Sequence, residues 1–134
     1  MAVYRMTIVD DHTLFRGALN QALSASMDAD VQESASLDEL NEQLSQKKDV
    51  DLVLLDLNMP GVQGLSGLMF LRAQYPEVPV VVCSANEDPG TIRRCIEFGA
   101  SGYIPKSQPI EHIREAVAKV LGGEVWTPPD VDLS

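Results

Sequence analysis

The fold of this chain is built around the stretch Asp51-Leu52-Val53-Leu54-Leu55-Asp56-Leu57-Asn58-Met59-Pro60-Gly61. It begins as an almost continuous apolar run, reaches a carboxylate at Asp56 and breaks at Pro60-Gly61. A strand that is apolar on both faces is typical of the middle of a parallel sheet. Open α/β sheets bind ligands outside the carboxyl ends of their strands, which is where Asp56 would stand. Two interpretations remain open: Asp56 is the nucleophile of a phosphoryl transfer, or it starts the turn before Pro60.

Four further stretches rich in apolar or β-branched residues predict strands on either side of this one. They cover residues 3–9, 31–35, 79–84 and 102–104. Five strands that alternate with five predicted helices indicate a doubly wound α/β fold, in which right-handed crossovers place helices on both faces of a parallel sheet. One core of this kind accounts for residues 1–122, and residues 123–134 are expected to form a linker or tail.

The predicted helices show both periodicity and end signals. In the first of them apolar residues recur at three- and four-residue spacing, in the series Leu14, Ala18, Ala22 and Leu19, Leu23. Asp88-Pro89 combines an N-cap residue with proline at the first helical position, and Gly99 is placed to end the helix that starts there. These signals predict that the fourth helix begins close after the fourth strand and leads into the fifth strand.

Composition limits the function classes. The chain has 134 residues, 45% of them hydrophobic, and a net charge of −10, which opposes binding to nucleic acid or anionic membranes and favours cations. No apolar run reaches the roughly 18 residues of a membrane span, and no signal peptide is evident. Cys83 and Cys95 stand in no metal or redox spacing, so we expect reduced, buried thiols and a cytoplasmic location.

The residues that end the predicted strands carry the candidate chemistry. Asp10-Asp11 end the first strand, Asp56 the third and Ser84 the fourth, while Lys106 follows the fifth. Because the carboxyl ends of parallel strands share one edge of the sheet, we expect these side chains to converge. Clustered carboxylates repel one another and require a cation, and oxygen ligands with room for water and phosphate suit Mg²⁺ better than zinc.

At these residues the sequence resembles the receiver domains of two-component response regulators, over residues 3–122. The motifs occur in the family's order: Ile8-Val9-Asp10-Asp11-His12, Leu54-Leu55-Asp56-Leu57-Asn58-Met59-Pro60-Gly61, Ser84-Ala85, Gly99-Ala100-Ser101-Gly102-Tyr103 and Lys106. The resemblance implies a flavodoxin-like sheet with strand order 2-1-3-4-5. Residues 1–122 would be the phosphoacceptor domain.

Two segments are most similar to one subgroup, which carries a C-terminal LuxR/NarL-type helix-turn-helix output domain. They are Asp10-Asp11-His12-Thr13-Leu14-Phe15-Arg16 and the tail Leu121-Gly122-Gly123-Glu124-Val125-Trp126. This similarity implies that residues 123–134 lead toward an output domain that controls transcription. DNA would then be bound only through that further C-terminal domain. If the 134 residues are the whole protein, we expect it to act through protein contacts instead.

The resemblance also implies roles for individual residues. Asp56 would accept a phosphoryl group from a histidine kinase, Lys106 would hold a phosphate oxygen, and Ser84 with Tyr103 would form the switch pair. The implied Mg²⁺ ligands are Asp10, Asp11, Asp56 and the backbone carbonyl of Asn58, with Asp11 the more direct of the acidic pair. Such a domain promotes its own phosphorylation and dephosphorylation and is not a turnover enzyme. A homodimer is compatible with the resemblance.

Other readings of the same residues stay open. The domain is a scaffold if it is never phosphorylated. A flavodoxin would need a hydroxyl- and glycine-rich loop after the first strand, and a dehalogenase-type phosphatase would need a second acid two residues after its nucleophile, so Asp10-Asp11 fits neither.

His12 is read as a partly exposed helix-start residue, and Trp126 either packs on the domain or docks a partner. Many receivers have proline after the lysine; here Ser107 follows, and a trans Lys106–Ser107 bond is predicted.

Overall fold

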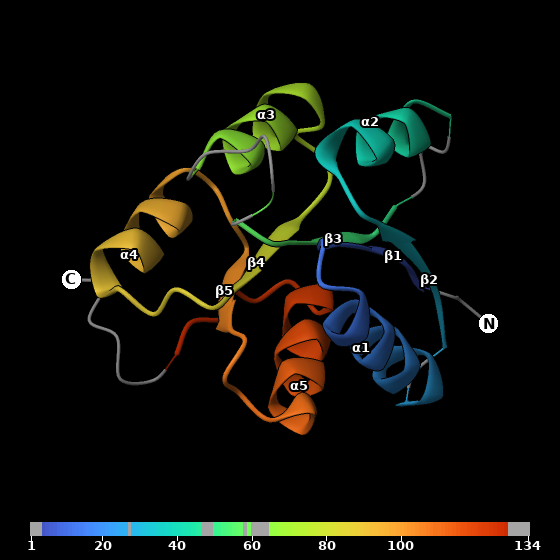
Figure 1. The fold of residues 1–134 in the computed structure, drawn as a ribbon. Helices are drawn as coiled ribbons and strands as arrows, with labels where there is room; N and C mark the ends of the chain where they lie inside the picture. Colours follow the sequence, from blue (N-terminus) through green and yellow to red (C-terminus); the bar gives the residue numbers. More distant parts are fainter. Residues whose placement is uncertain (1–3, 27, 47–49, 58, 60–64, 129–134) are drawn as a thin grey trace.

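The computed structural model describes residues 4–26, 28–46, 50–57, 59 and 65–128. These residues form a parallel five-stranded sheet in the order β2-β1-β3-β4-β5, with helices on both faces (Figure 1). The strands are β1 (Tyr4–Val9), β2 (Ala29–Ser34), β3 (Leu52–Leu55), β4 (Val80–Ser84) and β5 (Gly102–Pro105). The helices are α1 (Thr13–Ser26), α2 (Leu37–Gln46), α3 (Ser66–Gln74), α4 (Pro89–Glu97) and α5 (Ile110–Leu121). The predicted fold class and strand order are therefore confirmed.

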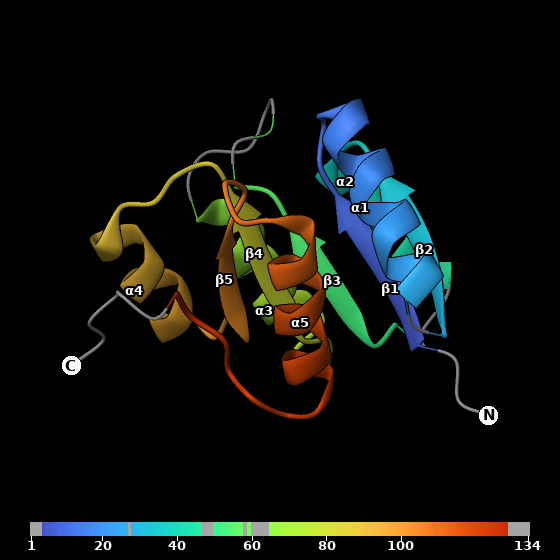
Figure 2. The ribbon, with the colours of Figure 1, turned by 90° about the horizontal axis from the view of Figure 1, so that it is seen from below.

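The central strand β3 is apolar along its whole length because helices cover both sides of it. Val53 and Leu55 pack in a core with side chains of α2, α3 and α4, whereas Leu52 and Leu54 pack with side chains of α1 and α5. Figure 2 shows α1 and α5 side by side on their common face of the sheet. None of the described helices has the length and apolar character needed to cross a membrane.

The N-terminal part of α1 differs from the simplest reading of its periodicity. Leu19 and Leu23 are fully buried, but Leu14 is 90% exposed. Phe15, four residues before Leu19, packs against the core in its place. Since each helical residue turns by about 100°, Leu14 lies well outside the stripe that Phe15, Leu19 and Leu23 form.

Local signals elsewhere behave as expected. The carboxylate of Asp88 accepts a hydrogen bond from the Thr91 amide at 3.1 Å, which caps α4, and Pro89 is its first residue. Gly99 has a φ of +102°, a conformation that glycine adopts without strain, and it ends the segment after α4. The described residues contain no cis peptide bond, so the Lys106–Ser107 bond is trans.

The segment after α5 lies against the free edge of β5. The Trp126 amide donates to the Ser101 carbonyl at 3.1 Å, and the Tyr103 amide donates to the Trp126 carbonyl at 3.1 Å. Trp126 and Gly102 thus form an isolated parallel bridge, and the Trp126 side chain packs on the core beneath α1 and α5. Of the two readings of Trp126, packing on the domain is the one observed. Pro128 is the last described residue of the expected linker.

Candidate functional site

Backbone pairing places two of the predicted carboxylates side by side. Val9 and Leu55 are partners in the register of β1 and β3, and Asp10 and Asp56 follow them directly. The hydrogen-bond ladder continues past the strands, because the Asp56 amide donates to the Val9 carbonyl at 2.9 Å and the Asp10 amide donates to Ser34 at 3.0 Å. Both carboxylate residues are 2% exposed. The sheet itself therefore fixes two buried acids at its carboxyl edge.

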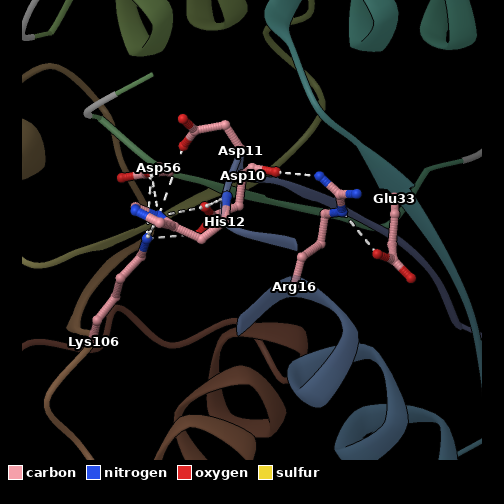
Figure 3. Close-up of polar contacts among 7 residues, drawn as sticks. All are labelled: Asp10, Asp11, His12, Arg16, Glu33, Asp56 and Lys106. Atoms are coloured by element: carbon pink, nitrogen blue, oxygen red, sulfur yellow. Dashed lines mark hydrogen bonds and ion pairs between the residues drawn. The ribbon is translucent and has the colours of Figure 1, made fainter. Parts of the chain in front are cut away.

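Lys106 brings a positive charge to these acids from the end of β5. Its amide donates to the Ser84 carbonyl at 2.8 Å, which continues the β4–β5 ladder. Its ammonium nitrogen lies 2.8 Å from Asp10 Oδ2 and 3.3 Å from Asp56 Oδ2 (Figure 3). Burial alone lowers the pKa of Lys106, but the hydrogen bond to Asp10 and the charges of Asp56 and Asp10 together raise this pKa above its ordinary value.

The acidic cluster is exposed to solvent at Asp11 and His12 and buried at Asp10 and Asp56. Ligand atoms of Asp10, Asp11, His12 and Asp56 all lie within 4.8 Å of one another. The Oδ1 atom of Asp10 accepts the His12 amide at 2.8 Å and its Oδ2 atom faces Lys106, whereas the Asp11 side chain is 33% exposed. Three carboxylates at a partly exposed position are a donor set that fits a hard divalent ion. The fourth predicted ligand, Asn58, lies outside the described residues.

His12 lies at the rim of this cluster, as a helix-start residue with 62% of its side chain exposed. Its Nδ1 atom is 3.1 Å from Asp10 Oδ1 and 3.0 Å from Lys106 Nζ. The two contacts exclude each other as hydrogen bonds, since a protonated Nδ1 donates to Asp10 and an unprotonated Nδ1 accepts from Lys106. The tautomer of His12 therefore decides which of the two hydrogen bonds is made.

The predicted switch residues lie together on β4 and β5. The Tyr103 side chain is fully buried, and its hydroxyl donates a hydrogen bond to the Asn86 carbonyl. Burial raises the pKa of Tyr103 to about 12, and a hydrogen bond with Ser84 opposes part of this rise. The Ser84 hydroxyl accepts the Asn86 amide at 3.2 Å. The ring thus points inward, behind Ser84 and the loop that follows β4.

Two contacts near the site were not predicted from the sequence. Arg16 on α1 donates from Nε to Glu33 at 2.7 Å and from its terminal nitrogen to the Asp10 carbonyl at 2.5 Å. The Lys106 ammonium lies 4.9 Å from the centre of the Phe15 ring. Phe15 and Arg16 belong to the segment that resembles one subgroup of the family, but no local pattern links Arg16 with Glu33, because the pairing depends on how α1 is rotated over β2.

Comparison with known proteins identifies the family. Residues 6–118, which make up most of the chain, match the response regulator receiver domain. The chain belongs to this family. In this receiver domain Asp10 and Asp11 follow β1, Asp56 follows β3, Ser84 is the last residue of β4 and Lys106 follows β5.

Some relatives of this receiver domain are named as transcriptional regulators. The glycerol metabolism activator of Pseudomonas putida is 42% identical over 130 residues, which cover 96% of this chain and 59% of that protein. The nitrate/nitrite response regulator NarL of Escherichia coli K12 is 34% identical over 118 residues, which cover 88% of this chain and 55% of that protein. The chain thus spans little more than half the length of these relatives.

A solved structure agrees with the same assignment. The LuxR family DNA-binding response regulator from Silicibacter pomeroyi superposes with a TM-score of 0.85 at 30% identity, covering 95% of this chain and 98% of that one.

Both cysteines of the receiver domain are buried free thiols. Burial raises the pKa of Cys83 to about 12 and that of Cys95 to about 11, which keeps both protonated at neutral pH.

Proposed function

We propose that this receiver domain accepts a phosphoryl group on Asp56 from a histidine kinase and thereby changes its surface to control an output, which is transcription. The position of Asp56 carries the proposal. It is a buried carboxylate at the end of the central strand, 3.3 Å from the Lys106 ammonium and clustered with Asp10 and Asp11. A buried acid paired with a lysine at an open sheet edge is suited to receive a group that itself carries negative charge.

In the proposed transfer, a carboxylate oxygen of Asp56 forms a bond to phosphorus while the P–N bond of a phosphohistidine breaks. The histidine nitrogen leaves with the electron pair of that bond and takes up a proton. Lys106 holds one phosphoryl oxygen as a point charge, and the Ser84 hydroxyl donates to another. Asp10, Asp11, Asp56 and the Asn58 carbonyl would hold Mg²⁺, which when bound offsets negative charge on the transferring group.

The proposed response runs through Ser84 and Tyr103. If Ser84 turns toward the phosphoryl group, its present contacts with Tyr103 and the Asn86 amide weaken. Because Tyr103 also donates to the Asn86 carbonyl, a movement of the Tyr103 side chain would release the loop after β4 to take a second position. A change of this kind alters the surface near α4 and β5 that a further domain, a second copy or another protein could bind.

Replacement of Asp56 tests the proposal directly. Wild type incubated with Mg²⁺ and acetyl phosphate should gain the mass of one phosphoryl group, located on Asp56 by peptide mapping, and Asp56→Asn should gain none while keeping its far-UV circular dichroism. Asp51→Asn is a matched control at the opposite end of the same strand, where the carboxylate accepts the Arg5 amide at 2.8 Å. It should still be labelled. A folded wild type that takes up no label would instead be a scaffold.

A further inference from the structure

Asp10 is held through each of its polar groups. Its amide donates to Ser34 at 3.0 Å, and its carboxylate contacts the His12 amide at 2.8 Å and Lys106 at 2.8 Å. Its carbonyl oxygen accepts a hydrogen bond from Arg16 at 2.5 Å. Of these contacts, the hydrogen bond from Arg16 comes from the side chain of a helix residue. The carbonyl that accepts it belongs to the peptide group that joins Asp10 to Asp11.

Arg16 is itself held in place from the other side. Its Nε donates to Glu33 Oε1 at 2.7 Å, and Asn20 donates to Glu33 Oε2 at 2.8 Å. The Arg16 side chain is only 15% exposed, and its planar fork binds the β2 carboxylate and the Asp10 carbonyl at once. Since the Arg16 charge is paired with Glu33, this contact brings little net positive charge to the cation site.

Arg16 lies behind the acidic cluster, not within it. Figure 3 shows Arg16 and Lys106 on opposite sides of Asp10, with Arg16 reaching the backbone of the turn. The Arg16 amide also donates to the His12 carbonyl at 2.9 Å, so side chain and backbone together connect α1 to the turn. Asp11, the more exposed acid, lies 3.7 Å from His12 Nδ1 and has no closer ion pair among the residues that the structure describes.

We propose that Arg16 is a positioning residue for the cation site: by holding the Asp10 carbonyl and Glu33, it fixes the Asp10–Asp11 peptide so that the Asp11 carboxylate faces Asp56. This inference rests on the proposed function, since it assigns to Arg16 control of the Mg²⁺ affinity on which phosphorylation depends. Groups that orient metal ligands without touching the metal typically change affinity by 10- to 100-fold when removed.

Charge and positioning predict opposite results for Arg16→Met. Removing a nearby cation and leaving Glu33 unpaired makes the site more negative, which by Coulomb's law alone tightens Mg²⁺ binding. Loss of positioning weakens it. We expect isothermal titration with Mg²⁺ alone to give a dissociation constant roughly tenfold higher for Arg16→Met than for wild type. Arg16→Lys, which keeps the charge but not the planar fork, should fall between them.

Phosphorylation kinetics separate positioning from general damage. With acetyl phosphate as donor, the Mg²⁺ concentration for half-maximal labelling should rise roughly tenfold in Arg16→Met, while the rate at saturating Mg²⁺ returns to that of wild type. Arg72→Met is a matched control, because Arg72 also donates to a backbone carbonyl, that of Val78 at 3.1 Å, but on α3. It should leave both quantities unchanged.

The outcomes discriminate between the two proposals. If wild type is labelled and Arg16→Met binds Mg²⁺ as tightly as wild type or more tightly, the positioning role is wrong and the proposed function stands. If wild type is not labelled, or Asp11→Ala binds Mg²⁺ as wild type does, the proposed function itself fails. If Arg16→Met does not fold, Arg16→Lys decides: unchanged Mg²⁺ affinity in that folded variant overturns the positioning role.

Discussion

Asp10 and Asp56 are both buried, and the Lys106 ammonium contacts each of them. Replacing Lys106 with methionine should therefore leave two buried carboxylates facing each other, at a cost on the order of 3 kcal/mol in the free energy of unfolding. Urea unfolding without divalent ions measures this loss. Added Mg²⁺ should restore part of it, because a ligand that binds only the folded chain stabilises it.

Lys119 provides the control for this prediction. It forms an exposed pair with Glu115 at 3.9 Å on the surface of α5. Lys119→Met should change the free energy of unfolding by less than about 0.5 kcal/mol, with no dependence on Mg²⁺. Equal effects of the two substitutions would contradict the view that Lys106 compensates buried charge.

The raised pKa of Lys106 makes its contribution to the free energy of unfolding depend on pH. Because the folded chain raises this pKa, the contribution of Lys106 is complete below the ordinary lysine value of about 10.4 and is lost as pH rises through the folded value. The stability difference between wild type and Lys106→Met should thus be constant near neutral pH and decline above about pH 10.4. Urea unfolding at a series of alkaline pH values tests the direction.

At the scale of elements, the junction between α4 and β5 depends on Gly99. Its φ of +102° strains any residue with a side chain, and an added Cβ would lie 2.9 Å from Arg72 Nε. Gly99→Ala should lower the free energy of unfolding by about 1–2 kcal/mol or more. Thermal unfolding followed at 222 nm, in the far-UV range, is a suitable measurement.

Gly17 is the matched glycine for comparison, because it lies on the exposed face of α1 with no heavy atom within 4 Å of an added Cβ. Gly17→Ala should stabilise the domain by roughly 0.5–1 kcal/mol, since alanine favours the helix more than glycine does. Two substitutions of the same chemistry are thus expected to have opposite signs. A destabilising Gly17→Ala or a neutral Gly99→Ala would refute this account of the backbone.

At the scale of the whole molecule, the segment around Trp126 covers the outer edge of the sheet at β5. Trp126→Ala removes the side chain that anchors this segment on the core and should cost about 1–2 kcal/mol. An uncovered strand edge also favours pairing with another chain, so concentration-dependent association should appear in sedimentation velocity. Val125→Ala, at a neighbouring side chain that is 61% exposed, should have neither effect.

Much of this architecture could be predicted because it depends on short-range patterns. Apolar residues on both faces of residues 52–55 require two covering layers of helices, and a parallel sheet brings all strand ends to one edge whatever their separation in the chain. The sequence therefore predicts the convergence of Asp10, Asp56 and Lys106, and the distances between their side chains agree with it.

Other features depend on tertiary packing, which no short stretch of the sequence predicts. The rotation of α1 decides that Phe15 is inside and Leu14 outside, and it also brings Arg16 to Glu33, 17 residues away. The docking of Trp126 on β5 is decided in the same way, since both partners are backbone groups without a sequence signature. Side-chain pairing of this kind follows from helix rotation and strand register, which the complete core fixes and no single segment contains.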